Sequence, residues 1–141
     1  MVDIDVVYES DLHCVATHGP SKLTLVTDAP VDNHGRGEGF SPTDLVATAL
    51  GTCMATFMGI LAQRKSWAIE GARLHVRKEM TKEGPRRIAR LECRLEMPAI
   101  TASLDASARN QLEHAARTCP VRLSIADAIE VPVEFVWPPL G

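Results

Sequence analysis

The first third of the chain alternates between apolar and polar residues with the two-residue period of β-strands. Ile4, Val6 and Tyr8 share one side of the opening segment, because neighbouring residues of a strand point to opposite faces. Two further strands are expected at 12–17 and 22–27, with a turn-forming glycine–proline pair between them. The chain therefore begins with a predicted antiparallel meander.

Segment 28–39 follows neither the strand period nor the helix period, and it is predicted to be a loop. It contains a proline, three glycines and the polar run Asp32-Asn33-His34. A loop of this length either serves a functional site or crosses the surface without a role. The sequence leaves both interpretations open.

A long helix is predicted to begin at Pro42 and to end near Arg64 or Lys65. Ser41 is a good N-cap, proline suits the first helical position, and Asp44 stands where a capping box places its acid. The helix is apolar on nearly every side, so it must be covered all round. A chain of 141 residues can hardly do this alone. We therefore expect a homodimer in which each subunit helps to cover the other's helix.

Part of this helix requires a comparison with membrane-spanning segments. The stretch 45–63 holds no charged residue and approaches the length of a spanning helix. However, it contains threonines, glycines and many alanines, and it lacks basic and aromatic flanks on both sides. We therefore predict a helix buried inside a soluble fold, with no membrane partner.

The second half of the chain predicts a hairpin, two helices and a final strand. Strands at 72–80 and 88–97 flank a turn, and the second strand alternates an apolar face with a charged one. An amphipathic helix at 105–118 is followed by a short helix at 121–128 and a strand at 131–136. Strands and helices are segregated along the sequence, which indicates the α+β class.

Size and composition narrow the range of partners. The length suits one domain over residues 1–141. The formal net charge is -3 and aromatic residues make up 4%, so nothing favours nucleic acid, which requires a basic face or stacking rings. The N-terminus has neither the basic start nor the apolar run of a signal peptide, so we expect a cytoplasmic protein whose thiols stay reduced.

The four cysteines are the main candidates for chemistry. No two of them form a C-x-x-C pair, so neither a zinc knuckle nor a thioredoxin-like motif is supported. Cys93 falls on the apolar face of its strand and is predicted to be a small core residue. Cys14 follows His13, but neighbours on a strand point to opposite faces, which argues against a nucleophilic pair.

The other two cysteines lie at contrasting positions. Cys119 precedes Pro120 at the start of a new helix, where free amides and the helix dipole favour a thiolate. Cys53 lies in the middle of the apolar helix, and on its own it would be interpreted as a core cysteine. The sequence by itself does not show that they meet. Scattered histidines predict no metal cluster, and no glycine-rich loop predicts a nucleotide site.

Two stretches resemble a known family. The segment 41–53, Ser-Pro-Thr-Asp-Leu-Val-Ala-Thr-Ala-Leu-Gly-Thr-Cys, resembles the S-P-x-[DE]-L-x-x-x-A-L-x-x-C signature of the OsmC/Ohr family. Residues 119–121, Cys-Pro-Val, resemble that family's second-cysteine motif, C-P-[VI]. The separation of the motifs and the order of elements also fit, so the resemblance covers almost the whole chain.

The resemblance implies a fold and an activity. The fold would be OsmC-like, with antiparallel sheets around a long buried central helix in an intertwined homodimer. The activity would be that of a thiol peroxidase, a reductase of small organic hydroperoxides with no bound haem, metal or flavin. By carry-over, Cys53 is the peroxidatic residue and Cys119 the resolving one. An external dithiol such as dihydrolipoamide would restore the pair.

The sequence departs from the family's pattern at two positions. Well-characterised members have a glutamate directly after the proline, where this chain has Thr43, and the acid comes one residue later as Asp44. They also have an arginine in the N-terminal strands, whereas the first arginine here is Arg36, in the loop. These three residues are auxiliary site candidates. The departures leave an alternative open, a non-catalytic OsmC-like module that binds a small apolar molecule.

Overall fold

A computed structural model describes residues 1–141, the whole sequence. The chain forms two compact units, Met1–Val46 and Ala47–Gly141. The single domain over 1–141 stays a prediction. The elements follow the chain as β1 (Ile4–Ser10), β2 (His13–His18), β3 (Thr24–Asp28), η1 (Val31–Asn33), α1 (Pro42–Lys65), β4 (Arg73–Met80), β5 (Ile88–Glu96), η2 (Ala99–Ser103), α2 (Ala106–Arg117), α3 (Pro120–Ser124) and β6 (Val133–Val136).

The first unit contains the predicted antiparallel meander, with strand order β1-β2-β3. Val6 is paired with Ala16, and Ala16 with Leu25, so these residues share one face of the sheet. The alternation predicted for β1 is therefore confirmed. Every residue of β1 is nevertheless exposed within the chain, so this sheet presents apolar side chains to its surroundings.

The loop between β3 and α1 contains one short 3-10 helix, η1. His34 follows it in the left-handed conformation, with φ of 67°. Gly35 then passes so close to Ala29 that a Cβ atom would lie 1.7 Å from the Ala29 carbonyl oxygen. Only glycine fits this approach, so the loop has a defined course rather than a wandering one.

The start of α1 confirms the predicted capping box. The Ser41 hydroxyl accepts the amide of Asp44 at 3.1 Å, and the Asp44 carboxylate accepts the amide of Ser41 at 2.9 Å. This exchange satisfies two amide donors that a helix end leaves unpaired. The helix ends at Lys65, as predicted.

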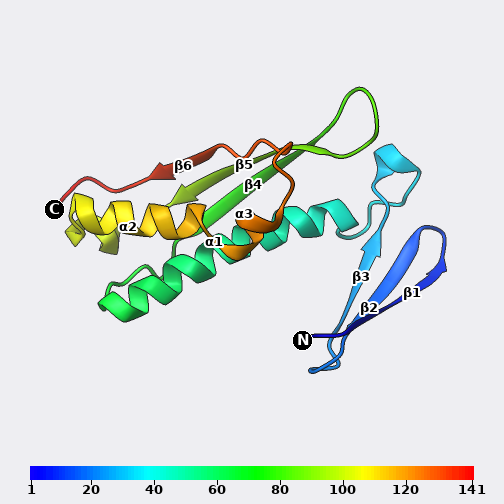
Figure 1. Cartoon of the computed structure of the whole chain (residues 1–141), viewed down its shortest axis with the longest axis horizontal. Coiled ribbons are helices and arrows are strands. Elements are labelled where there is room, and N and C mark those ends of the chain that lie inside the picture. Colours follow the sequence, from blue (N-terminus) through cyan, green and yellow to red (C-terminus); the bar gives the residue numbers. More distant parts are fainter. The chain divides into compact units, whose positions relative to one another are not determined.

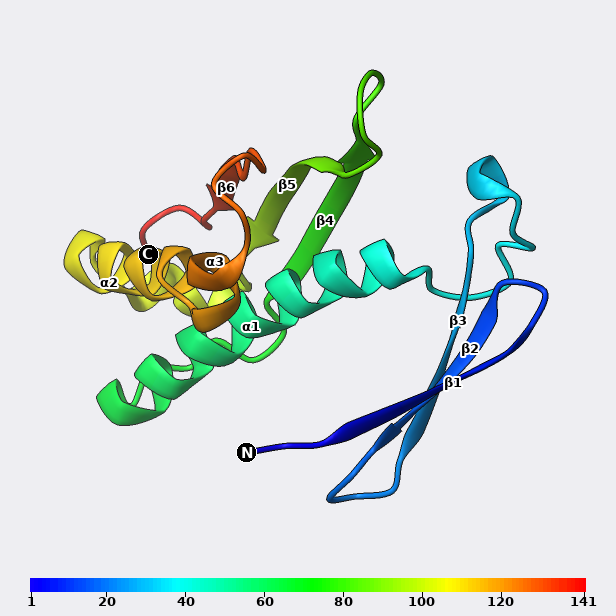
Figure 2. The ribbon, with the colours of Figure 1, turned by 45° about the vertical axis from the view of Figure 1, so that its right-hand side comes forward.

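Helix α1 is long and apolar enough to cross a membrane by length and composition. In the second unit one row of its residues is buried, and the helix lies with α2 against one face of the second sheet (Figures 1 and 2). The helix approaches β4 closely at Gly51, where a Cβ atom would lie 3.0 Å from a methyl of Val76. The buried row consists of Ala47, Leu50, Gly51, Met54, Met58 and Ala62.

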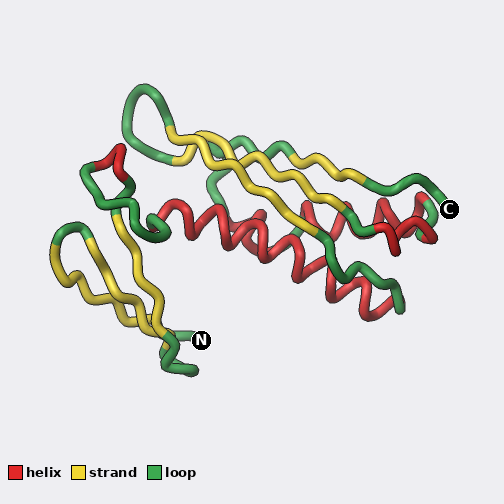
Figure 3. Tube along the Cα trace, turned by 180° about the vertical axis from the view of Figure 1, so that it is seen from behind, coloured by secondary structure: helices red, strands yellow, loops and turns green.

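The second sheet corrects the prediction of purely antiparallel sheets. Its three strands lie side by side in the order β4-β5-β6 (Figure 3). Strand β6 runs parallel to β5, and the arrows of both point the same way in Figure 1. The cause is the connection between them, because the helices that join β5 to β6 return the chain to the same end of the sheet. The predicted hairpin of β4 and β5 is confirmed.

The segment after Pro120 differs in length from its prediction. The helix expected at 121–128 ends at Ser124, and Ile125 is already extended, with ψ of 154°. The chain must unwind there because Glu130 bridges to Arg90 beside β5 before β6 begins. The final strand is correspondingly shorter than the predicted 131–136.

Strand β5 has the two faces that its sequence predicts. Leu91, Cys93 and Leu95 are at most 1% exposed and pack into the core. On the other face Arg90 and Arg94 pair with glutamates of the same strand and of the segment 130–134. Exposed pairs of this kind add little stability, so the apolar face holds the sheet to the helices.

Candidate active site

The structure brings two of the four cysteines together. Cys53 lies in the middle of α1 and is partly exposed, whereas Cys119 is fully buried. The Cys119 thiol is within hydrogen-bonding reach of the Cys53 side chain. Both residues belong to the second unit. The long-range contact that the sequence could not show is therefore present within one chain, and no disulfide links any of the four cysteines.

Cys119 is held at a junction between two helices. Helix α2 ends at Arg117, and the Thr118 hydroxyl donates to the carbonyl of His114 at 2.7 Å. Cys119 is the extended N-cap of α3, and Pro120 occupies the first helical position. A proline there needs no amide partner, so the chain turns sharply without losing a hydrogen bond.

The surroundings of Cys119 act on its thiol in opposite directions. Burial raises the pKa of Cys119 most strongly, and the contact with Cys53 raises it further. Hydrogen bonds from the amides of Arg122 and Val121 lower this pKa, but they do not outweigh burial. The sequence predicted that free amides at this helix start favour a thiolate, and they do lower the pKa of Cys119. The net shift is upward because desolvation of the charged form outweighs them.

A third thiol lies near the pair. Cys93 on β5 is 1% exposed, and burial, followed by the charge of Cys119, raises its pKa to about 11. The positive charge of Arg122 acts against this shift. The predicted core role of Cys93 is confirmed by its burial, and the proximity of its thiol to Cys119 is a new observation.

An open groove of about 860 Å³ runs between α1 and α2. The two helices run in opposite directions along it (Figures 1 and 2). At one end lie Phe57, one turn beyond Cys53, and Thr118, the neighbour of Cys119. The groove therefore ends next to the thiol pair. Its lining residues are Phe57, Ile60, Leu61, Arg64, Ser107, Asn110, Gln111, His114, Ala115 and Thr118.

The auxiliary candidates lie in the first unit. Arg36 donates to the Asp11 carboxylate at 3.1 Å, and both side chains are exposed. The Thr43 and Ser41 hydroxyls are 3.2 Å apart, so Thr43 and Asp44 both contact the cap of α1. Asp44 precedes Cys53 by nine residues of one helix, about 13.5 Å along its axis at 1.5 Å per residue.

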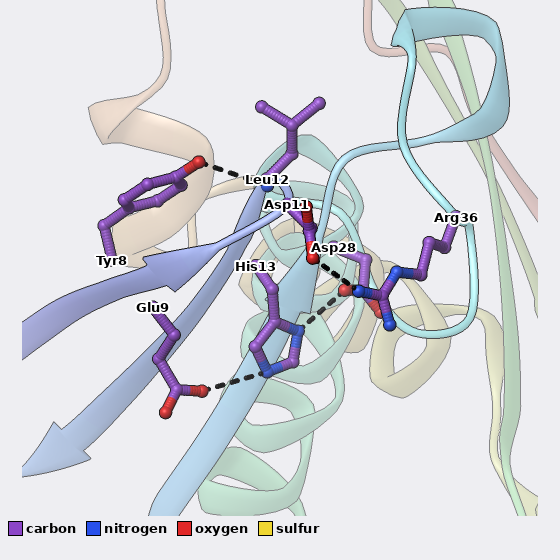
Figure 4. A network of polar contacts seen from close by, with 7 residues as sticks. All are labelled: Tyr8, Glu9, Asp11, Leu12, His13, Asp28 and Arg36. Atoms are coloured by element: carbon purple, nitrogen blue, oxygen red, sulfur yellow. Dashed lines mark hydrogen bonds and ion pairs between the residues drawn. The ribbon is translucent and has the colours of Figure 1, made fainter.

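Sequence reasoning missed a polar network around β2. The His13 ring bonds the Asp28 carboxylate at 2.7 Å and lies 3.4 Å from the Glu9 carboxylate (Figure 4). Asp28 is buried, so the contact supplies a partner for its carboxylate. The sequence could have indicated this contact through the predicted pairing of β2 with β3, since His13 lies opposite Asp28 in that pair. The polar contacts of the His13 ring are therefore with two carboxylates. This agrees with the prediction that His13 and Cys14, as neighbours on a strand, do not form a nucleophilic pair.

The thiols should differ in reactivity. At pH 8 we expect iodoacetamide to label Cys53 well before Cys93, because a thiol with a pKa of about 11 is only about one part in a thousand ionised there and is also buried. Since the pKa is raised, labelling of Cys93 should increase as the pH rises. Peptide mass spectrometry measures each site, and protein unfolded in urea is the control. Equal labelling of both sites in the folded protein would contradict this assignment.

Comparisons with known proteins support the fold and the motifs. The family model described as OsmC-like protein matches residues 35–134. A solved structure from Psychrobacter arcticus, to which an osmotic stress and detoxification response is ascribed, is 38% identical with a TM-score of 0.88, and 96% of each chain is covered. No functionally curated protein matches the sequence.

Two more distant structures share the fold. The organic hydroperoxide resistance protein OsmC of Legionella pneumophila is 14% identical, with a TM-score of 0.75 and 97% of each chain covered. The organic hydroperoxide resistance protein OhrB of Bacillus subtilis is 15% identical, with a TM-score of 0.67, covering 96% of this chain and 98% of its own. With the family match and the Psychrobacter relative, they account for α1 as the core helix of a soluble fold, and this chain belongs to the OsmC-like protein family.

Proposed function

We propose that this protein is a thiol peroxidase that reduces small organic hydroperoxides with Cys53 and Cys119. The observation that carries the proposal is the contact between a partly exposed thiol and a buried one. Cys53 is partly exposed within the chain, whereas Cys119 is 0% exposed and shielded from solvent. Exposure therefore supports Cys53 as the peroxidatic residue and Cys119 as the resolving one.

The reaction takes place in two steps. The Cys53 thiolate attacks the peroxide O–O bond, forms an S–O bond and releases the alkoxide, which is protonated to the alcohol. The Cys119 thiol then attacks the Cys53 sulfenic acid and forms the disulfide, and its proton leaves with the sulfenic hydroxyl as water. An external dithiol returns the pair to two thiols by exchange. This cycle suits a reducing compartment such as the cytoplasm and uses no bound cofactor.

The groove supports an organic peroxide rather than hydrogen peroxide. Phe57, Ile60 and Leu61 offer apolar surface next to the thiol pair, and burial of a hydrocarbon group against them is favourable. The names of the Legionella and Bacillus structures, organic hydroperoxide resistance proteins, point to the same substrate class.

A peroxide-consumption assay with cumene hydroperoxide and dihydrolipoamide tests the activity. We expect turnover by the wild type and its loss in Cys53→Ser, because the attacking thiol is gone. In a single turnover without dihydrolipoamide, Cys119→Ser should consume about one equivalent and accumulate oxidised Cys53, since no protein thiol resolves the sulfenic acid. Cys14→Ser, which lies in the first unit, is the control and should keep its activity. An inactive wild type that still binds an apolar probe would favour the alternative, a non-catalytic binding module.

Arg36 is proposed as an auxiliary residue that stabilises the Cys53 thiolate, because it is the first arginine in the chain. Its guanidinium is paired with Asp11 on an exposed surface, so a role at the thiol requires a change of partner. We expect Arg36→Ala to shift the pH dependence of Cys53 alkylation to higher pH. Asp11→Asn is the matched control, because it frees the guanidinium. An unchanged profile in Arg36→Ala would remove this role from Arg36, and Thr43 and Asp44 would remain as candidates.

The assembly proposed for this activity is an intertwined homodimer. Ile4, Val6 and Tyr8 are each 62% exposed on one face of the first sheet, and apolar residues gathered on an exposed face mark interaction sites. The face has the same composition in a second copy, so a two-fold interface buries both. A dimer of this kind buries more than about 2,000 Å² in total.

Sedimentation velocity at micromolar concentration tests the dimer. We expect Val6→Glu to shift the wild-type dimer toward monomer, because a carboxylate would be buried in the interface. Thr24→Glu is the matched control, since Thr24 pairs with Thr17 on the opposite face and gains the same charge. A wild-type protein that sediments as a stable monomer would refute the proposal.

A further inference from the structure

Two arginines and two aromatic rings join α2 to the end of the chain. The guanidinium of Arg109 lies 5.1 Å from the Trp137 ring centre, and that of Arg117 lies 5.3 Å from the Phe135 ring centre. The two rings are stacked with their centres 6.1 Å apart. Glu113 lies between the arginines in sequence and accepts the Trp137 indole N–H at 2.8 Å. We call these five residues the α2–β6 ladder.

Arg117 is the end of the ladder that lies nearest the thiols. It is the last residue of α2, two positions before Cys119. Besides the Phe135 ring, its guanidinium contacts the Val133 carbonyl at 3.3 Å and the Glu113 carboxylate at 3.7 Å. The Arg117 side chain, although 45% exposed, thus contacts strand β6, the Phe135 ring and its own helix α2.

These contacts bear on the position of the Cys119 sulfur. Only Thr118 separates Arg117 from Cys119, and helix α3 begins directly after Cys119. Disulfide formation must bring two sulfurs from contact to about 2.05 Å with a restricted dihedral angle. A displacement of about 1 Å at a reacting centre can lower the rate about a hundredfold. The contacts that hold Arg117 at the C-terminus of α2 therefore bear on the rate of disulfide formation.

We propose that Arg117 is a positioning residue that holds Cys119 in line with Cys53 for disulfide formation. The inference rests on the proposed function for its biological role, but the geometry it concerns exists without any peroxide. Arg117 touches neither substrate nor the reacting sulfurs. Its effect is confined to the second step, because Cys53 is positioned by α1 and not by the ladder.

A partly exposed cation above a ring contributes only modestly to stability. A purely structural role would therefore lower the melting temperature slightly and leave the fate of oxidised Cys53 unchanged. The positioning role predicts the converse pattern. The ratio of Cys53–Cys119 disulfide to Cys53 sulfinic acid falls, while the rate of the first oxidation stays the same. The sulfinic acid forms when a second peroxide oxidises the sulfenic acid before Cys119 reaches it.

The experiment compares wild type, Arg117→Ala, Arg117→Lys and Phe135→Leu. Arg94→Ala is the matched control, because Arg94 is also 45% exposed and paired with glutamates but contacts no ring. Rapid-quench mass spectrometry after one pulse of cumene hydroperoxide gives both oxidation products. We expect disulfide formation to slow about tenfold in Arg117→Ala and Phe135→Leu, with partial recovery in Arg117→Lys and no change in Arg94→Ala.

A second readout separates this inference from the peroxidase proposal. Diamide oxidises neighbouring thiols to a disulfide and is itself reduced to the hydrazine, with no peroxide involved. Slower diamide-driven disulfide formation in Arg117→Ala than in Arg94→Ala supports the positioning role even if the wild type is inert to peroxides. Equal rates and equal product ratios in these two variants and the wild type, with melting temperatures showing all three folded, would overturn it.

Discussion

The structure depends on the need to cover one uncharged helix. The segment 45–63 holds no charge, so water is a poor surrounding for almost every side of α1. The sheet β4-β5-β6 and α2 cover the row that includes Leu50, Met54 and Met58, each 0% exposed. The apolar face of the first sheet is left for a partner in the proposed dimer. Burial of apolar surface thus forms the core and also motivates the proposed dimer.

The same helix gives Cys53 its chemical setting. A thiol on a buried helix is ordinarily inert, but Cys53 lies beside the groove between α1 and α2 and next to the start of α3. Cys119 contacts Cys53 because the chain turns between the end of α2 and the start of α3 at Pro120. The result is a partly exposed cysteine in contact with a buried one, which supports the proposed roles of attack by the first and resolution by the second.

Electrostatics distinguishes the thiols more finely than their motifs do. Two amides favour the Cys119 thiolate, yet burial dominates and raises its pKa. Burial, followed by the charge of Cys119, raises the pKa of Cys93 to about 11. Cys53 is partly exposed, whereas Cys93 and Cys119 are buried and have raised pKa values, so an oxidant is expected to react first at Cys53. In the proposed role of Arg117, the α2–β6 ladder then positions the Cys119 sulfur relative to Cys53.

The sequence by itself determined the local structure and the family. Capping residues around Ser41, the alternation in β1 and β5 and the paired motifs at 41–53 and 119–121 act over short distances or survive as patterns. Tertiary structure alone decided the rest: the parallel pairing of β6, the contact of Cys53 with Cys119, the raised pKa of Cys119 and the attachment of Arg117 to Phe135. Each of these depends on distances between residues far apart in the chain and on the water that packing removes, which periodicity and motifs do not encode.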